Sequence, residues 1–273
     1  MKALKRRSLQ LVLLLTLISL VTCDSGTILD NTTIGSRAVV ALYNDRGCWE
    51  ESVVALKNMY EWLGYSVQLV DAEFVREHGL GEYKIFCVPG GDMYAYSLDL
   101  GPEGIAEIRG FVRFGGGYMG ICAGSNFAGT NVIWRGNVLD MQCLELYHGT
   151  SQGPINEIFS YPGYGMCRID ITDHTHPITA GLTTQNWILY YWGPQFTVEP
   201  GADVTVLGRY DITGGAAMLA FEYGQGRAFI IGSHPEIEED SRRDGVTWGE
   251  YMDDQGSDWP LLVAATEWCL KKR

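Results

Sequence analysis

A cysteine between two glycines, at the end of an apolar run, constrains this chain more than any other feature. The run is YMGIC at residues 118–122, and AGSNFAG follows it directly. A Gly-x-Cys-x-Gly sequence after a buried strand forces a sharp turn into a helix, so that the cysteine lies above the edge of a sheet. The N-terminus of that helix would stabilise a thiolate. The pattern therefore predicts a nucleophile at Cys122.

A histidine and a glutamate near the other end of the chain supply the remaining groups of a catalytic triad. Both occur in GSHPEIEED, which begins at Gly232 and follows the apolar run AFII. A histidine beside a cysteine can take its proton, and a carboxylate on the other ring nitrogen orients and charges the imidazole. We therefore expect Cys122, His234 and Glu236 to form a Cys-His-Glu triad.

Apolar runs and helical spacing alternate along the first half of the chain. The expected strands cover residues 37–43, 65–70, 85–89 and 118–122, and the expected helices cover residues 50–63 and 102–114, with Trp62 and Leu63 on the buried side. Such alternation is typical of parallel βαβ units with a crevice at the carboxyl ends of the strands. Residues 131–231 instead favour antiparallel strands, and residues 258–270 predict a closing amphipathic helix.

Several further segments extend this pattern along the chain. In order they are YNDRGCWEESVVAL, CVPGGDMY, GTSQGPI, THPITAGL, YYWGPQF and YGQGRAFIIGSHPE. With the elbow, this series resembles the class I glutamine amidotransferase-like superfamily, and most of all its branch named after the N-terminal domain of biotin-protein ligases. The resemblance implies an α/β fold, a flavodoxin-like three-layer sandwich with a mainly parallel central sheet, in a single domain over residues 37–273.

The same resemblance suggests which groups surround the cysteine. The backbone N–H groups of Gly91 and Ala123 would form the oxyanion hole, and Asp92 and Tyr94 would contact the substrate, as Tyr118 could at the mouth of the crevice. Glutamine-hydrolysing members commonly carry a glutamine four residues after the cysteine, where this chain has Asn126. The shorter amide makes free glutamine a weaker candidate for the substrate. Asp92 could alternatively cap a helix, and Tyr118 could simply pack.

The first 22 residues have the pattern of an export signal. A basic start precedes an apolar stretch that ends in LVTC. LVTC resembles a lipoprotein box, with Thr22 where a smaller residue is usual, so lipid attachment at Cys23, plain secretion and an uncleaved anchor are all open. Residues 23–36 would tether the domain. We expect an extracytoplasmic protein, secreted or membrane-anchored, that contacts the membrane only through the signal segment or this lipid.

The chain has seven cysteines, more than a reduced fold needs and fewer than a disulfide scaffold would show. Cys87 lies in an apolar run and Cys269 in the last expected helix, so both read as inert core residues. Outside the cytoplasm, Cys48, Cys143 and Cys167 could oxidise. Cys143 with Cys167 is the preferred disulfide, because both flank the irregular region after the elbow.

Charge and histidine content narrow the partners. The chain carries 33 acidic and 20 basic side chains, a net charge of −13, and four of the cations lie in residues 1–22. Nucleic acid is therefore a poor partner. His174 and His176 are spaced so that they could share a metal ion, but no third ligand is evident, and this segment reads as a structural turn. We expect neither a metal nor a cofactor.

Three functions fit these features. The first is a cysteine-dependent hydrolase of amide bonds, acting on a small-molecule or peptide amide through a thioester at Cys122. The second is a non-catalytic extracytoplasmic module that binds a small ligand in the same crevice. The third is an amidotransferase subunit that works with a separate chain, which an export signal argues against. No synthase or ligase domain is recognised in the chain.

Overall fold

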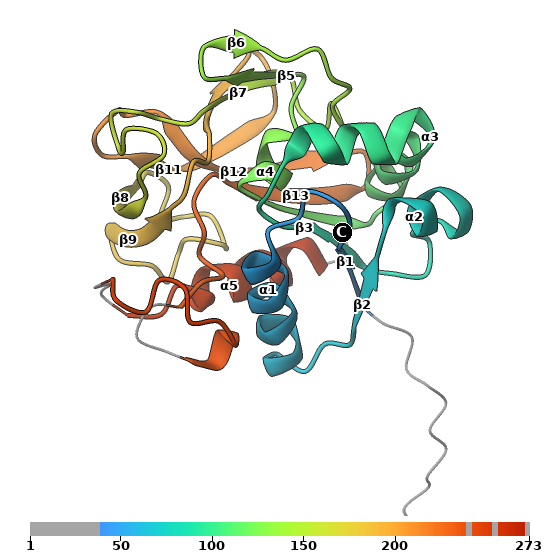
Figure 1. Ribbon diagram of the computed structural model, residues 1–273, viewed down its shortest axis with the longest axis horizontal. Helices are drawn as coiled ribbons and strands as arrows, with labels where there is room; N and C mark the ends of the chain where they lie inside the picture. Colours follow the sequence, from blue (N-terminus) through green and yellow to red (C-terminus); the bar gives the residue numbers. More distant parts are fainter. Residues whose placement is uncertain (1–38, 239–241, 253–255, 271–273) are drawn as a thin grey trace, which may run out of the picture. The chain divides into compact units, whose positions relative to one another are not determined.

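Five parallel strands form the centre of the sheet, and they come from both halves of the sequence (Figure 1). The computed structural model describes residues 39–238, 242–252 and 256–270. Across the sheet, the five strands are β2 (Val67–Val70), β1 (Val40–Tyr43), β3 (Ile85–Val88), β4 (Gly117–Ile121) and β13 (Gly226–Ile231). All neighbours among them pair in parallel. The carboxyl ends of β3, β4 and β13 therefore meet at one edge.

Mostly antiparallel pairing extends the sheet beyond β13. The first added strand, β12 (Ala216–Tyr223), pairs antiparallel with β13, and two branches continue from it. One branch runs through β10, β7, β5 and β6, and the other through β11, β8 and β9. These strands are β5 (Asn131–Trp134), β6 (Asn137–Val138), β7 (Gly149–Gly153), β8 (Gly165–Ile171), β9 (Gln185–Tyr190), β10 (Gln195–Val198) and β11 (Val204–Tyr210). The predicted antiparallel character is confirmed for most of these pairs, although β5 and β7 pair in parallel.

Helices cover both faces of the parallel strands (Figure 1). Apolar side chains of α1 (Glu50–Trp62) and α5 (Trp259–Leu270) share one core cluster, and those of α2 (Ala72–His78), α3 (Met93–Arg113) and α4 (Ala123–Asn126) share another. Strand β4 contributes Met119 to the first cluster and Tyr118 to the second, since neighbouring side chains of a strand point to opposite faces. A short 3-10 helix, η1 (Arg242–Asp244), precedes α5. The predicted α/β fold with a mainly parallel centre is confirmed.

Helix α3 begins well before the predicted helix at residues 102–114. The Asp92 side chain accepts hydrogen bonds from Tyr94 N (2.9 Å) and Ala95 N (3.4 Å) and so caps the helix at Met93. Gly101, with φ of 58°, then breaks the helix before Pro102. The sequence analysis found only the part that follows this break, and it missed the two-turn helix α2 entirely.

The predicted burial of Trp62 was wrong. Its side chain is 59% exposed, at the end of α1, and its ring contacts that of Trp259 at 5.5 Å between centroids. The guanidinium of Arg243 lies over the same ring. Trp62 therefore covers the start of α5 from the outside, because a position at the last turn of a helix escapes the sheet that buries the earlier turns.

The predicted disulfide between Cys143 and Cys167 was also wrong. Both thiols are free, and they belong to the core clusters on opposite faces of the sheet. Cys167 lies on β8, whereas the segment before Cys143 is tied to α3 by a hydrogen bond from Ser97 Oγ to the Gln142 carbonyl, 2.8 Å. Burial raises the pKa of the Cys143 thiol to about 11.

The predicted export signal (1–22), the tether (23–36) and the lipidation site Cys23 lie outside the described residues. Within the described part, no helix is both long enough and apolar enough to cross a membrane.

Candidate active site

The cysteine elbow forms where the sequence predicts it, directly after β4. Cys122 has φ of 48° and ψ of −104°, a conformation that costs a non-glycine residue on the order of 1–3 kcal/mol. A hydrogen bond with the neighbouring strand maintains this conformation: Cys122 N donates to the carbonyl of Ile231 at the end of β13, at 2.9 Å. A Cβ on Gly124 would lie 2.2 Å from the carbonyl oxygen of Val88, so the turn requires glycine there. Contacts with β3 and β13 thus fix the position of Cys122.

The helix after the elbow is too short for the stabilisation that we expected from its N-terminus. Helix α4 has four residues, which is barely one turn. A helix dipole grows from aligned peptide units, so one turn gives a thiolate little stabilisation. Positive charge for the sulfur has to come from His234 instead.

A buried hydrogen-bonded chain links His234 to two other elements. His234 Nδ1 lies 2.9 Å from Glu236 Oε1, and both side chains are almost fully buried. The same carboxylate oxygen accepts a 2.6 Å hydrogen bond from Ser52 Oγ on α1. Ser52 Oγ in turn accepts a 3.0 Å hydrogen bond from Gly90 N. The imidazole is therefore oriented by a carboxylate that is itself fixed.

The charge state of His234 follows from two opposing effects. Burial by itself would lower the pKa of the ring, but attraction to the Glu236 carboxylate and to the Cys122 sulfur opposes it. The attraction wins, and the pKa of His234 is raised to about 10. At neutral pH the site accordingly favours an imidazolium, the form that stabilises a thiolate beside it.

The sulfur of Cys122 and the outer ring nitrogen of His234 differ in their hydrogen bonding. Cys122 Sγ donates to the carbonyl of Tyr191 at 3.6 Å. His234 Nε2 is buried and has no hydrogen-bond partner among the described residues. Rotation of the Cys122 side chain away from Tyr191, or arrival of a substrate, would give Nε2 its partner.

Two backbone N–H groups face the cysteine without acceptors. Among the described residues, neither Gly91 N nor Ala123 N has a hydrogen-bond acceptor. Gly91 has φ of 146°, and a Cβ there would lie 2.1 Å from the Gly47 carbonyl oxygen and 2.4 Å from Tyr96 Oη, so only glycine fits. The pair that the resemblance names for the oxyanion hole is thus free to donate.

A pocket of about 570 Å³ opens above Cys122. Of the predicted substrate contacts, Asp92, Tyr94 and Asn126 all line it, and Asp92 also caps α3. Asn126 Nδ2 reaches the Cys122 carbonyl at 3.4 Å, while its Oδ1 is buried and has no partner among the described residues. Tyr118 does not line the pocket: it is fully buried and donates to the Gly124 carbonyl at 2.6 Å.

Sequence reasoning missed several residues of the site, among them Ser52, Trp49 and Tyr191. Trp49 packs its ring against that of His234, with centroids 4.9 Å apart and planes at 90°, and Tyr191 supplies both a ring and the carbonyl that Cys122 contacts. The one available signal was Ser52, a small polar residue at a position that helical spacing places on the buried side of α1.

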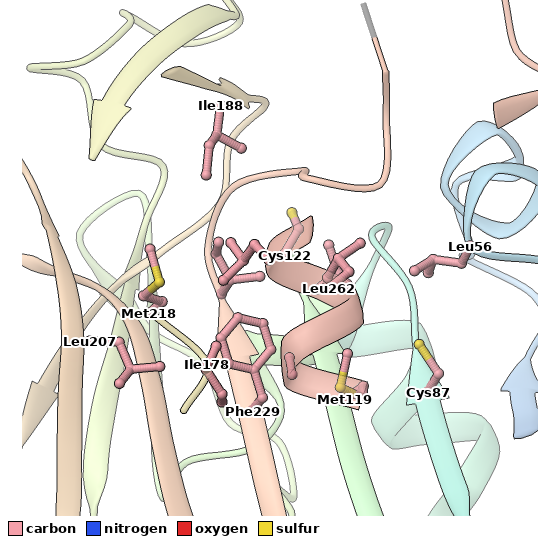
Figure 2. Packing of buried hydrophobic residues seen from close by; sticks show 14 of the residues in the cluster. Leu56, Cys87, Met119, Cys122, Ile178, Ile188, Leu207, Met218, Phe229 and Leu262 are labelled. Atoms are coloured by element: carbon pink, nitrogen blue, oxygen red, sulfur yellow. The ribbon is translucent and has the colours of Figure 1, made fainter. Parts of the chain in front are cut away.

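Cys87 and His176 have structural surroundings rather than those of a reactive group. Cys87 and Met119 pack among apolar side chains below Cys122 in the view of Figure 2, where Leu262 of α5 is also drawn. His176 Nδ1 accepts a hydrogen bond from Ile178 N at 3.2 Å, which makes its segment a turn. No group of three or more metal-binding side chains occurs among the residues that the structure describes.

Comparison with known proteins places the chain in a family. The family described as "Biotin-protein ligase, N terminal" matches residues 38–253. The biotin–protein ligase of Schizosaccharomyces pombe is 26% identical over 216 residues, which cover 72% of this chain and 33% of that protein. This chain thus spans about a third of the length of that ligase.

Solved structures share the fold at low identity. A glutamine amidotransferase from Thermotoga maritima matches with a TM-score of 0.56 and 12% identity, over 87% of this chain and 100% of that one. A ThuA-like protein from Bacteroides uniformis matches with a TM-score of 0.56 and 14% identity, over 86% of this chain and 93% of that one. At these identities the likeness concerns the fold alone. By the family match, which spans most of its length, the chain belongs to the biotin-protein ligase N-terminal family, on a glutamine amidotransferase-like fold.

Proposed function

We propose that the protein is a cysteine-dependent hydrolase of amide bonds in which Cys122 is the nucleophile. The observation that carries the proposal is the strained, pocket-facing Cys122 beside a His234–Glu236 pair that Ser52 holds in place. Free N–H groups on Gly91 and Ala123 support it, because acyl transfer needs donors for a developing oxyanion. The substrate is a small-molecule or peptide amide.

Acylation begins with attack of the Cys122 sulfur on the carbonyl carbon of the amide. The carbonyl π electrons move to oxygen, where the N–H groups of Gly91 and Ala123 stabilise the negative charge. When the intermediate collapses, the C–N bond breaks, and the nitrogen leaves as ammonia or an amine with a proton from His234 Nε2. The products of this half-reaction are a thioester on Cys122 and the released amine.

Deacylation reverses the roles with water as the nucleophile. His234 Nε2 takes a proton from water while the oxygen attacks the thioester carbon, and the C–S bond then breaks to release the carboxylic acid. The sulfur leaves as a thiolate, which the imidazolium stabilises. Glu236 neither gains nor loses a proton during the cycle; its role is to orient the ring.

A small-ligand-binding module without turnover is the second candidate. The hydrogen bond from Cys122 Sγ to the Tyr191 carbonyl favours it, because a sulfur that donates is a protonated thiol and not the attacking thiolate. In such a module the strained elbow would serve only to shape the pocket.

Mass spectrometry on the folded protein separates the two candidates. The protein is incubated with a panel of amides while ammonia or amine release is measured, and intact mass is recorded after a rapid acid quench. A hydrolase shows release together with an adduct of acyl mass on Cys122, and Cys122→Ser abolishes both while Cys87→Ser keeps them. Binding of an amide without release or adduct in the wild-type protein would support the module instead.

We further propose that the protein works outside the cytoplasm, attached to the membrane through a lipid on Cys23 or released from it. The support is the basic and apolar pattern of residues 1–22 and the LVTC sequence. Metabolic labelling with a fatty acid, in the wild-type protein and in Cys23→Ala, tests the lipid. Recovery of the full-length, unlabelled chain from the cytoplasm would contradict the proposal.

A further inference from the structure

Aromatic rings form most of the wall around Cys122. Five of the residues that line the pocket are aromatic: Trp49, Tyr94, Trp134, Tyr191 and Trp192. Tyr94 is 42% exposed, and the other four are half-buried, so each presents part of a ring toward the opening. Aromatic faces attract other rings and cations, whereas they repel anions.

The rings on one side of the pocket are fixed against one another. Tyr191 contacts Trp49 at 5.1 Å and Trp192 at 4.5 Å between centroids, and Trp248 packs behind Trp49 at 5.0 Å and behind Tyr191 at 5.1 Å. Rings with such neighbours lose little further side-chain freedom when a ligand arrives. The wall is therefore pre-organised for a flat group.

The formal charge at the mouth is negative. No lysine or arginine occurs among the described residues that line the pocket, and the carboxylate there is that of Asp92. The imidazolium of His234 also lines the pocket, but its charge is already matched by the carboxylate of Glu236, 2.9 Å away. Arg46 lies near enough to Asp92 to interact with it through charge, but its guanidinium is already bound to Asp99, with Nε 3.0 Å from Oδ2 and Nη2 2.6 Å from Oδ1. A substrate carboxylate in this pocket would lose its water without gaining an unpaired cation, which is costly.

We infer that this site takes amides whose side chain is a flat aromatic ring and which carry no negative charge near that ring. The inference rests on the proposed function for the reacting bond, and on the aromatic wall and Asp92 for the selectivity. A cavity of about 570 Å³ lies in the usual range for small-molecule sites and holds a single ring with its amide. Free glutamine fits poorly, because its α-carboxylate finds no basic partner other than His234, which Glu236 already pairs.

Tryptophan fluorescence titration of the Cys122→Ser protein tests the selectivity without turnover, since three tryptophans line the pocket. Four probes form a matched set: phenylalaninamide is cationic with a ring, N-acetylphenylalaninamide is neutral with a ring, N-succinylphenylalaninamide is anionic with a ring, and glycinamide has no ring. We expect Kd for the first two to be about tenfold or more below Kd for glycinamide, an effect in the range of ring contacts. The succinyl compound should bind about tenfold more weakly than the acetyl compound.

Two substitutions locate the effects. Asp92→Asn keeps an acceptor for the α3 cap, so the fold should persist while the preference for the acetyl over the succinyl compound shrinks. Tyr94→Ala, on an exposed side chain, should weaken both ring compounds about threefold and leave glycinamide unchanged.

Either of two results would overturn the inference: equal Kd values for glycinamide and the ring compounds, or equal Kd values for the succinyl and acetyl compounds. The proposed function has a separate readout, since ring-selective binding with no amine release from the wild-type protein would contradict hydrolysis alone.

Discussion

The middle and the carboxyl ends of the same parallel strands differ in chemistry although both are buried. In the middle, Cys87 of β3, Met119 of β4 and Phe229 of β13 pack in one apolar cluster at 0% exposure. At the ends, four buried side-chain atoms have no hydrogen-bond partner among the described residues: Asn126 Oδ1, Ser233 Oγ, His234 Nε2 and Glu236 Oε2. Only a few residues along each strand separate the two regions.

Because of this difference, the stability of the fold and the reactivity of the Cys122 thiol should depend on different residues. A buried polar atom without a partner costs on the order of 1–3 kcal/mol, so the strand ends weaken the fold unless a ligand or water completes them. The apolar middle offsets that cost. We therefore expect substitutions at the strand ends to change thiol chemistry more than unfolding, and substitutions in the middle to do the reverse.

The largest effect should appear when the two thiols on neighbouring strands are compared. At pH 7 iodoacetamide should alkylate Cys122 about 10³-fold or more faster than Cys87, because Cys122 faces the pocket beside His234, while complete burial raises the pKa of Cys87 well above its usual range. Peptide mapping of the folded protein after timed labelling measures the ratio. Cys122→Ser should remove the fast phase, and Cys87→Ser should keep it. Similar rates at the two thiols would remove the distinction between the regions.

Truncation in the middle of β13 should mainly affect unfolding. Phe229→Ala deletes a fully buried ring from the cluster drawn in Figure 2, which typically costs about 3–5 kcal/mol in the free energy of unfolding. Urea denaturation followed by circular dichroism measures this loss. The alkylation rate of Cys122 per folded molecule should stay within about twofold of wild type. A large change in that rate would mean that the strand ends depend on packing below them.

Removal of the imidazole should change the chemistry at the carboxyl ends of the strands and not the packing in their apolar middle. His234→Gln takes away the cation that favours the thiolate, so alkylation of Cys122 at pH 7 should slow about 10²-fold. Timed labelling and peptide mapping of the folded variant measure the rate. The Cys87 rate serves as an internal control. An unchanged Cys122 rate would favour the binding module.

The same histidine should give stability a pH dependence of known sign. Its pKa is raised from 6.5 to about 10 on folding, so the stabilisation that it adds is fully present below about pH 6.5 and is lost as the pH rises toward 10. The difference in unfolding free energy between wild type and His234→Gln should therefore shrink over that window. Urea titrations at pH 6, 8 and 10 follow it, and a difference that grows with pH would contradict the raised pKa.

Local patterns made much of this architecture predictable, and long-range contacts limited the rest. The elbow at Cys122, the strands around it and α5 follow from apolar runs and glycine spacing, which act within a few residues. The placement of Gly91 and Ala123 came from resemblance to a family. The Cys143–Cys167 pairing failed because sequence does not reveal which face of the sheet each thiol occupies. Ser52 was missed because its partner Glu236 is 184 residues away.

The smallest expected effect concerns Ser52 of α1, whose hydroxyl hydrogen-bonds to Glu236 and Gly90 at the strand ends. Ser52→Ala removes the 2.6 Å hydrogen bond to Glu236 Oε1 and leaves Gly90 N without its acceptor. A hydrogen bond to a charged group contributes about 1.5–3 kcal/mol, and part of that loss should reach His234 through the less restrained carboxylate. We expect Cys122 alkylation at pH 7 to slow about 3- to 10-fold.

A matched control distinguishes this positioning role from a general loss of stability. Ser97→Ala removes another buried helical hydroxyl, which donates to the Gln142 carbonyl at 2.8 Å on the other face of the sheet. Both variants should lose about 1 kcal/mol in urea denaturation, because each removes the side-chain hydrogen bond of a helical serine. Only Ser52→Ala should slow the alkylation of Cys122. If the two variants slow it equally, or neither does, then Ser52 merely supports the fold, and the link from α1 through Glu236 to His234 has no effect on the thiol.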